Sequence, residues 1–382
     1  MRKVIVFALV FSLLAWVPAT EAAAVDLELS GKSAVLMDVA TGTVLYERNA
    51  HEPLPPASVT KIMTMLLIME AIDSGRIGWE DPVTASEGAS AKGGSQIYLK
   101  AGETMTVTDL LKSIAVSSAN DAACAMAEHI CGSESAFVDA MNEKARALGM
   151  EDTYFVNCTG LDDSPEAEKH RTSAYDIALM SRELLKNHPD IRKFTTIWMD
   201  TIRDGAFGLS NTNKLIRFYA GATGLKTGFT SGAGYCLSAT ASREGMELIA
   251  VVMGSDTSQN RNESCKRMLD YGFASYALVS PQPEGECRVP VKLGTLDSVR
   301  AVPQREAVIL MEKVRKNTVT SRIELLPETA APVEPGTKLG ELVILAGEEE
   351  LDRIPLVAEE AVPRLGFGRI WAMILGKIAF GG

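Results

Sequence analysis

The chain has 382 residues, of which 46% are hydrophobic and 23% are charged, with a formal net charge of −11 at pH 7. This composition is typical of a globular protein and excludes a disordered, collagen-like or multi-span membrane chain. The negative charge argues against nucleic acid as a partner, and the length fits two domains or one large domain with an appendage.

Residues 1–24 have the pattern of a secretory signal peptide. Arg2 and Lys3 precede an apolar run over residues 4–17, and small residues follow at positions 22–24. An uncleaved anchor helix is the alternative, but the run is shorter than the ~20 residues that a membrane span needs. We therefore expect the protein to be exported.

The next segment predicts a hairpin followed by a long helix. Residues 34–39 and 43–47 are apolar-rich strand patterns with a short turn between them. Two prolines at 55 and 56 then break the chain, and apolar residues recur at helical spacing from Ile62 to Met69.

The middle of the chain predicts a block of helices followed by consecutive strands. The helices are expected over residues 121–130, 134–148 and 172–185, the strands over 224–230, 235–241 and 247–252, and a final helix over 262–276. Short glycine-containing turns make the three strands antiparallel neighbours, and the first hairpin must join them to complete one sheet. We therefore predict an α+β fold, with an antiparallel five-stranded sheet and helices on both faces.

Beyond this domain, a proline- and glycine-rich segment predicts a linker, and short apolar runs with turn residues between them predict a small β-rich domain. The predicted domains are a signal peptide at 1–24, a catalytic domain at 25–278, a linker at 279–287, a β-rich domain at 288–358 and a tail at 359–382.

The tail predicts an amphipathic helix on a membrane surface. On a helical wheel, Ile370, Trp371 and Ile374 share one side, whereas Arg369 and Lys377 lie on the other. The alternatives are a terminal helix packed on the core and, less favoured because of its two charges, a true span. Together with export, this predicts a position on the outer face of the cytoplasmic membrane.

The cysteines and histidines give no sign of a metal site. The six cysteines include no C-x-x-C pair, and the four histidines do not cluster near them. Cys124 and Cys131 are seven residues apart on a predicted helix, about 10 Å between Cα atoms, which is too far for a disulfide. We expect the cysteines to be small buried hydrophobic residues.

A serine and a lysine lie three residues apart where the first long helix begins. Residues at this spacing share a helix face, so the Lys61 amine can reach the Ser58 hydroxyl. Serine needs a base to become a nucleophile, and Lys61 can be that base only when it is neutral, which burial or a neighbouring cation favours. Taken alone, S-x-x-K is expected about once or twice by chance in such a chain.

Two further triplets have the residue types of a ligand-binding cleft. Ser118-Ala119-Asn120 lies in a break between predicted helices, and Lys226-Thr227-Gly228 lies on a predicted strand, where Gly228 leaves room beside the backbone. Each triplet alone is more simply explained as a polar loop or edge strand. The three motifs in this order, however, are typical of penicillin-interacting serine acyl-transfer enzymes.

The wider sequence resembles the serine D-alanyl-D-alanine carboxypeptidases, the low-molecular-mass penicillin-binding proteins of bacterial cell envelopes. The resemblance covers most of residues 30–277, with the matching segments at 56–61, 157–163, 172–176, 226–230 and 269–273. This family also has a β-rich second domain and an amphipathic carboxy-terminal anchor.

The resemblance implies a role for each motif residue. Ser58 would be the nucleophile, Lys61 its base and Ser118 a proton relay. Lys226 would keep Lys61 neutral and orient Ser118, and Asn120 would hold the substrate amide. The substrate carboxylate would be bound by Thr227 and Arg261, and the oxyanion hole would be formed by the backbone N–H groups of Ser58 and Phe229. No metal and no cofactor is implied.

The implied activity is removal of the terminal D-alanine from peptidoglycan stem peptides, with β-lactams acylating the same serine. Alternatives from the same site are D,D-endopeptidase, transpeptidase or β-lactamase activity. The chain has no convincing E-x-x-L-N pattern, which class A β-lactamases use for deacylation, and this counts against antibiotic hydrolysis. A non-catalytic wall-binding or penicillin-sensing protein would be expected to carry a damaged motif, whereas all three motifs are intact.

Overall fold

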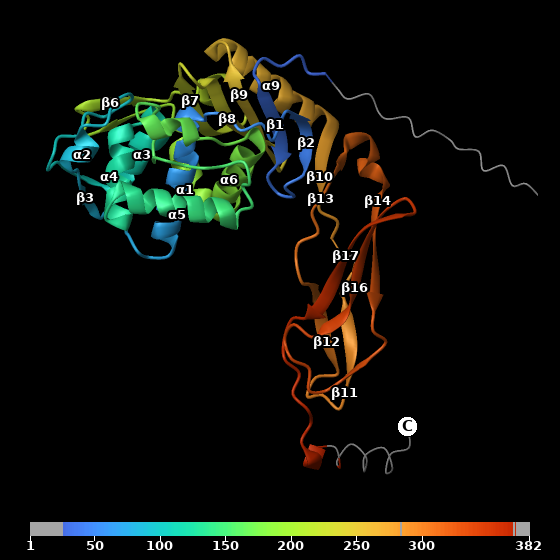
Figure 1. The fold of residues 1–382 in the computed structure, drawn as a ribbon. Helices are drawn as coiled ribbons and strands as arrows, with labels where there is room; N and C mark the ends of the chain where they lie inside the picture. Colours follow the sequence, from blue (N-terminus) through green and yellow to red (C-terminus); the bar gives the residue numbers. More distant parts are fainter. Residues whose placement is uncertain (1–25, 283–284, 370, 372–382) are drawn as a thin grey trace, which may run out of the picture.

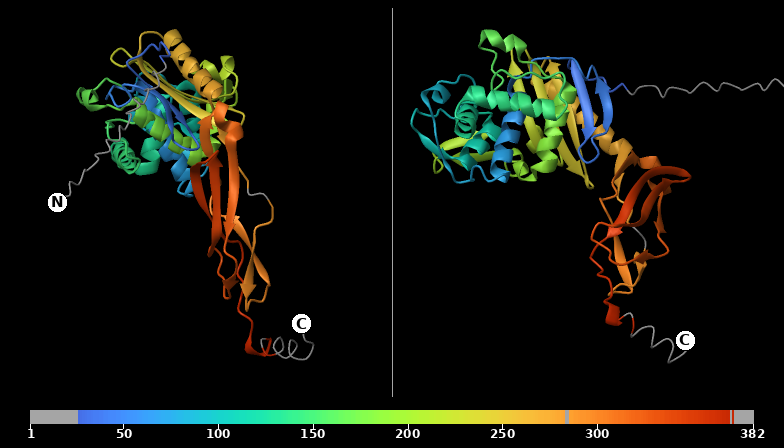
Figure 2. Two further views of the ribbon diagram at one scale, coloured as in Figure 1. Left: turned by 90° about the vertical axis from the view of Figure 1, so that its right-hand side faces the viewer. Right: turned by 60° about the horizontal axis from the view of Figure 1, so that its bottom comes forward.

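The structure of the protein, a computed structural model, describes residues 26–282, 285–369 and 371. The predicted signal peptide lies outside these residues. An α+β part over residues 26–275 is followed by an elongated β-rich part over residues 276–282 and 285–358, which extends away from it (Figures 1 and 2).

One five-stranded antiparallel sheet organises the α+β part. Its strands are β1 (Ser33–Asp38), β2 (Val44–Arg48), β7 (Ala222–Thr230), β8 (Gly234–Arg243) and β9 (Met246–Ser255). The spatial order is β2-β1-β9-β8-β7, so the early hairpin joins the late strands through the pairing of β1 with β9. The predicted sheet is confirmed, and β7 lies at its edge.

The alternating pattern of the strands builds a core on each face of the sheet. Val35 and Met37 of β1 belong to one buried cluster, together with α1 and α6 side chains. Ala34 and Leu36 belong to a second cluster, which includes side chains of α9. Successive strand residues point to opposite faces of the sheet. Each of the two clusters contains helix side chains, so both faces are covered by helices, as predicted.

The long helices are α1 (Lys61–Asp73), α3 (Val107–Ser117), α4 (Asn120–Cys131), α5 (Glu134–Ala147), α6 (Ala174–Asn187) and α9 (Ser258–Ser275). Short elements fill the connections. They are the 3₁₀ helices Ala57–Thr60, Pro165–Lys169 and Pro189–Ile191 and the helices α2 (Glu87–Ser90), α7 (Arg192–Thr195) and α8 (Leu215–Phe218). Two small antiparallel sheets pair β3 (Pro82–Thr84) with β4 (Thr104–Thr106) and β5 (Met199–Ile202) with β6 (Phe207–Ser210).

Helix α9 begins four residues before the predicted start at 262. Thr257 caps it, because its side chain accepts a hydrogen bond from the backbone N–H of Asn260. Its first turn is polar and shows no apolar periodicity, so the predicted start was too late. Arg261 therefore lies on the helix rather than before it.

A small two-stranded sheet begins the β-rich part. β10 (Tyr276–Val279) pairs antiparallel with β13 (Ile309–Glu312), directly after α9. The other strands, β11 (Arg288–Lys292), β12 (Ser298–Pro303), β14 (Val319–Leu325), β15 (Thr329–Ala330), β16 (Lys338–Ala346) and β17 (Glu349–Ala358), form one six-stranded sheet with its own core. The β-rich part is confirmed; the exact limits of the predicted linker and domains stay predictions.

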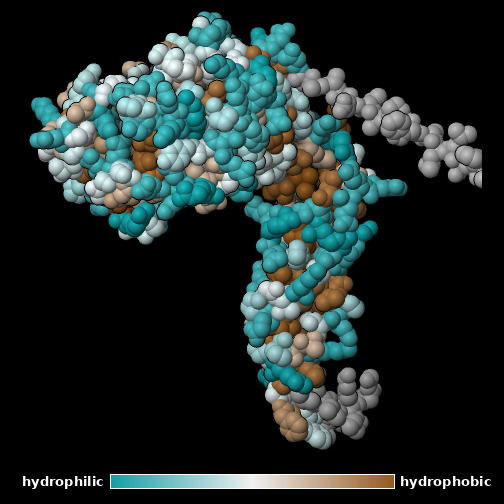
Figure 3. Space-filling view, viewed as in Figure 1, coloured by the Kyte–Doolittle hydropathy of each residue, from teal (hydrophilic) through white to brown (hydrophobic). Residues whose placement is uncertain are grey.

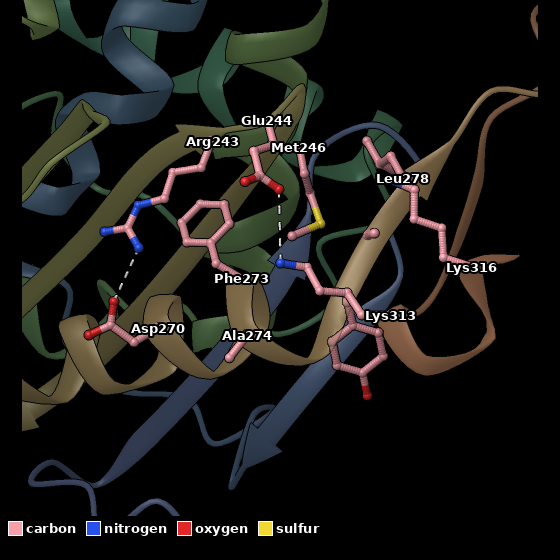
Figure 4. Close-up of a pocket in the computed structure, with 11 residues that line it drawn as sticks. Arg243, Glu244, Met246, Asp270, Phe273, Ala274, Leu278, Lys313 and Lys316 are labelled. Carbon is pink, nitrogen blue, oxygen red and sulfur yellow. Dashed lines mark hydrogen bonds and ion pairs between the residues drawn. The ribbon is translucent and has the colours of Figure 1, made fainter.

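The junction between the two parts contains a cavity of about 300 Å³ (Figure 4). Lys313, from the 3₁₀ helix Lys313–Thr318, lies 4.0 Å from the Glu244 carboxylate, and Arg243 lies 3.4 Å from that of Asp270. Hydrophobic residues gather on the visible face of this junction (Figure 3), and Leu278 is among the residues that line the cavity (Figure 4). None of the predicted site residues lines this cavity.

The end of the described chain carries two exposed aromatic rings. Phe367 and Trp371 are 77% and 49% exposed, and their ring centroids lie 6.2 Å apart. Residue 370 and residues 372–382 of the tail predicted as an amphipathic helix lie outside the described residues. Among the residues that are described, no helix is both long and apolar enough to cross a membrane.

Candidate active site

Ser58 lies in a tight turn at the amino end of α1. The two prolines end the preceding segment, and Ala57–Thr60 forms a 3₁₀ helix that leads directly into α1. The Thr60 hydroxyl donates to the carbonyl of Ala57 at 2.8 Å, which stabilises this turn. Ser58 is therefore in the 3₁₀ turn rather than in α1 itself, and its side chain is only partly buried.

The Lys61 amine is buried beside the Ser58 hydroxyl. Its Nζ lies 3.0 Å from Ser58 Oγ and donates to the carbonyl oxygen of Thr159 at 2.8 Å. Burial lowers the pKa of Lys61 to about 7, although the nearby Cys158 and Asp121 act in the opposite direction. A substantial fraction of this amine is therefore neutral at physiological pH and can accept a proton.

Lys226 of β7 is a second buried amine in the same region. Burial, followed by repulsion from Lys61 and Arg261, holds the pKa of Lys226 well below its usual value. Its Nζ donates to the carbonyl of Thr227 at 2.8 Å. The hydrogen bonds of the described residues do not include one from Lys226 to Ser118, so the implied orientation of Ser118 by Lys226 is not seen here.

Ser118 and Asn120 lie where α3 ends and α4 begins. Ser118 closes α3 in the left-handed conformation, with φ 63°, which turns the chain sharply between the two helices. Asn120 is the first residue of α4 and donates through Nδ2 to the carbonyl of Gly93 at 2.7 Å. Its Oδ1 is buried and has no partner among the described residues, so an acceptor is available there.

A cavity of about 320 Å³ collects side chains from distant parts of the sequence. Its lining includes the predicted residues Ser58, Ser118, Thr227, Phe229 and Arg261, with Gly228, and also Ser95, Thr212, Lys214, Tyr235, Ser258 and Asn262. The other three predicted residues do not line it: Lys61, Asn120 and Lys226 are at most 2% exposed. The three motifs therefore meet in one region, as the sequence predicted.

Thr212 and Lys214 were not among the predicted site residues. They belong to a connection between β6 and α8 that has no apolar periodicity, so its polar residues read as an ordinary loop. The only sequence signal is a pair of asparagines, Asn211 and Asn213, on either side of Thr212. Paired asparagines are common in turns and do not by themselves indicate a site.

The segment at 157–160 holds the carbonyl of Thr159, to which the Lys61 amine donates, in a fixed position. Asn157 Oδ1 accepts hydrogen bonds from the backbone N–H groups of Thr159 and Gly160, at 3.1 and 2.7 Å. Gly160 has φ +81°, and a Cβ atom there would lie 1.8 Å from the carbonyl oxygen of Ala57. Glycine is therefore required where this segment contacts the turn that carries Ser58.

The described residues contain no group of three or more histidine, cysteine or acidic side chains that could hold a metal ion. Hydroxyl, amide and guanidinium groups line the cavity, and buried amine groups lie behind it.

Comparison with known proteins identifies both parts of the chain. Residues 19–257 match the model of the D-alanyl-D-alanine carboxypeptidase family, and residues 279–364 match that of the penicillin-binding protein 5 C-terminal domain. The chain is 45% identical to D-alanyl-D-alanine carboxypeptidase DacF of Bacillus subtilis over 348 residues, which is 90% of this chain and 88% of that protein.

Solved structures give the same result. Penicillin-binding protein 5 from Haemophilus influenzae matches with a TM-score of 0.73 and 30% identity, over 88% of this chain and 98% of that one. Penicillin-binding protein D2 from Listeria monocytogenes, solved with ampicillin bound, matches with a TM-score of 0.60 and 33% identity, over 65% of this chain and all (100%) of that one. The chain therefore belongs to the serine D-alanyl-D-alanine carboxypeptidases, the family that its sequence motifs resemble.

Proposed function

We propose that this protein is a D,D-carboxypeptidase that removes the terminal D-alanine from peptidoglycan stem pentapeptides through an acyl-enzyme on Ser58. The observation that carries the proposal is the Lys61 amine, which is 3.0 Å from Ser58 Oγ and has its pKa lowered to about 7. A buried neutral amine next to a hydroxyl is the arrangement that a serine nucleophile needs when no histidine serves as its base.

In the first acyl transfer, Lys61 accepts the Ser58 proton while Oγ attacks the carbonyl of the penultimate D-alanine. The oxyanion is stabilised by the backbone N–H groups of Ser58 and Phe229, and such preorganised donors are worth about 3 kcal/mol each. Ser118 relays a proton to the departing amine, and D-alanine leaves. Water then attacks the acyl-enzyme in the second transfer and restores the free Ser58 hydroxyl.

The rest of the cavity positions the substrate. Thr227 and Arg261 bind its free carboxylate. The buried Oδ1 of Asn120, which has no partner among the described residues, accepts a hydrogen bond from the amide N–H of the substrate. Lys226 lies buried behind them, where burial and the nearby Lys61 amine hold its pKa low. The peptide lies along the free edge of β7, which already pairs with β8 on its other side.

β-Lactams are expected to acylate the same serine, because they present a strained amide and a carboxylate in the arrangement of the peptide terminus. The similarity to a penicillin-binding protein solved with ampicillin bound supports this. The acyl-enzyme formed from a β-lactam hydrolyses slowly, so these compounds inhibit the enzyme.

The direct test is the release of free D-alanine from diacetyl-Lys-D-Ala-D-Ala by the purified protein, measured across pH. Because Lys61 must be neutral to accept a proton, kcat/KM should increase as the pH rises through about 7 and should be low at more acidic pH. No release of D-alanine, with rapid turnover of penicillin instead, would contradict the proposed function. A flat profile between about pH 5.5 and 8.5 would remove Lys61 as the base.

We also propose export and attachment to the outer face of the cytoplasmic membrane through the tail. The exposed rings of Phe367 and Trp371 support it, since aromatic side chains favour the interface between water and lipid. Deletion of residues 364–382 should move the mature protein from the membrane fraction to the soluble fraction, measured by fractionation and penicillin labelling. Equal distribution of the two forms would show that the tail is not an anchor.

A further inference from the structure

The cavity beside Ser58 is positively charged, although the protein as a whole is acidic. Among the described residues that line it, the charged ones are Lys214 and Arg261, and no carboxylate is present. The formal net charge of the whole chain is −11, so this local excess is not a general property of the surface. A cationic cavity of this kind attracts an anionic ligand.

Lys214 and Arg261 differ in how much of their hydrogen-bonding capacity is already used. Arg261 is 5% exposed and donates to the side chain of Asn262, at 2.9 and 3.1 Å, and to the carbonyl of Cys236 at 3.4 Å. The Lys214 side chain is exposed to the cavity, and in the described part of the chain no hydrogen bond or ion pair involves its ammonium group. All three of its N–H donors are therefore available to a ligand.

The backbone that carries Lys214 is fixed by two buried asparagines. Asn211 Nδ2 donates to the carbonyl of Ile197 at 2.7 Å, and Asn213 Nδ2 donates to that of Gly224 on β7, also at 2.7 Å. Buried amides that are hydrogen-bonded in this way are costly to displace. Lys214 is thus held at a defined position beside β7 and is not on a freely moving loop.

Thr212, between the two asparagines, connects this segment to the K-T-G motif. Its Oγ1 lies 2.7 Å from Thr227 Oγ1, and its backbone N–H donates to the carbonyl of Val116 at 3.2 Å. When Thr212 donates to Thr227, the Thr227 proton is free to point toward a carboxylate in the cavity. The segment at 211–214 therefore orients the hydroxyl of Thr227 and supplies a cation that lines the same cavity.

We propose that Lys214 is a specificity-determining residue that binds the free C-terminal carboxylate of the substrate, with Thr212 positioning the hydroxyl of Thr227 for the same group. This inference rests on the proposed function, since it assigns a residue to the substrate terminus of that reaction. It makes Lys214 responsible for part of the preference for substrates that end in a free carboxylate over those that end in an amide.

The test compares Lys214→Met with wild type on diacetyl-Lys-D-Ala-D-Ala and on the same peptide with a C-terminal amide. For the free acid, kcat/KM should fall about fivefold, mainly through KM, because one accessible charge contact is lost. For the amide it should be nearly unchanged, so the acid-to-amide preference falls by the same factor. Lys214→Arg should keep most of the preference, because it keeps the charge.

Lys193→Met is the matched control, since Lys193 is an exposed lysine on α7 outside the cavity. It removes the same charge from the protein and should leave the preference unchanged. An equal loss on acid and amide in Lys214→Met, or no change in KM for the acid, would overturn the assignment of Lys214. If the proposed function itself were wrong, the wild type would release no D-alanine, and this result differs from the two outcomes above.

Discussion

Replacing Ser58 by alanine is expected to abolish D-alanine release and covalent labelling by fluorescent penicillin together. The substitution removes the atom that forms the acyl bond, and loss of a serine nucleophile lowers the rate by at least about 10³-fold. Labelling on a denaturing gel and a D-alanine assay measure the two losses independently.

The fold should survive this substitution, because Ser58 is only partly buried and the turn is held by the hydrogen bond between Thr60 and Ala57. The melting temperature should therefore stay close to that of wild type, and Ser280→Ala, at an exposed position, should be unchanged in every assay. Labelling or D-alanine release that persists in Ser58→Ala would show that another residue is the nucleophile.

The second large effect is expected from Gly160→Ala. Its new Cβ would lie 1.8 Å from the Ala57 carbonyl oxygen and 2.8 Å from Thr60 Oγ1, so either the segment at 157–160 or the turn that carries Ser58 must move. We expect a loss of about 3 to 4 kcal/mol in the free energy of unfolding. Penicillin acylation should slow at the same time, because Lys61 donates to Thr159 in this segment.

Gly149→Ala separates the steric clash from backbone strain. Gly149 has φ +71°, similar to the +81° of Gly160, but a Cβ atom there would meet nothing within 4 Å. This variant should lose only about 1 kcal/mol in the free energy of unfolding, and penicillin should acylate it at the wild-type rate. If urea unfolding gives equal losses for the two variants, the contact between Gly160 and Ala57 is not what requires glycine.

Much of the fold was predictable, because the pattern that determines it is strong. In β1 and β9 the side chains alternate between two cores, whereas in α1 apolar residues occupy most positions from Ile62 to Met69, a run long enough to favour a helix. The start of α9 was missed because a capping threonine and a polar first turn, not periodicity, determine it. β10 was missed because its four residues are too few to show alternation.

The candidate site was predictable where the motif residues have unusual chemistry at a fixed spacing. Ser58 lies in the 3₁₀ turn three residues before Lys61, and the structure places Lys61 Nζ 3.0 Å from Ser58 Oγ. The contribution of Thr212 and Lys214 could not be predicted, because it arises from pairing across the fold. Thr212 meets Thr227 only after β7 has joined the sheet, and no local pattern records that contact.

The topology of the sheet determines when during its synthesis the protein can become active. β1 precedes Ser58 in the chain, yet it lies between β2 and β9, and β9 ends only at Ser255. A nascent chain that stops before this strand lacks the partner of both β1 and β8, and therefore cannot align the hydroxyl with β7. Such long-range pairing also makes folding slow. Because the site is complete only when β9 is in place, reactivity toward penicillin reports that the catalytic domain has folded completely.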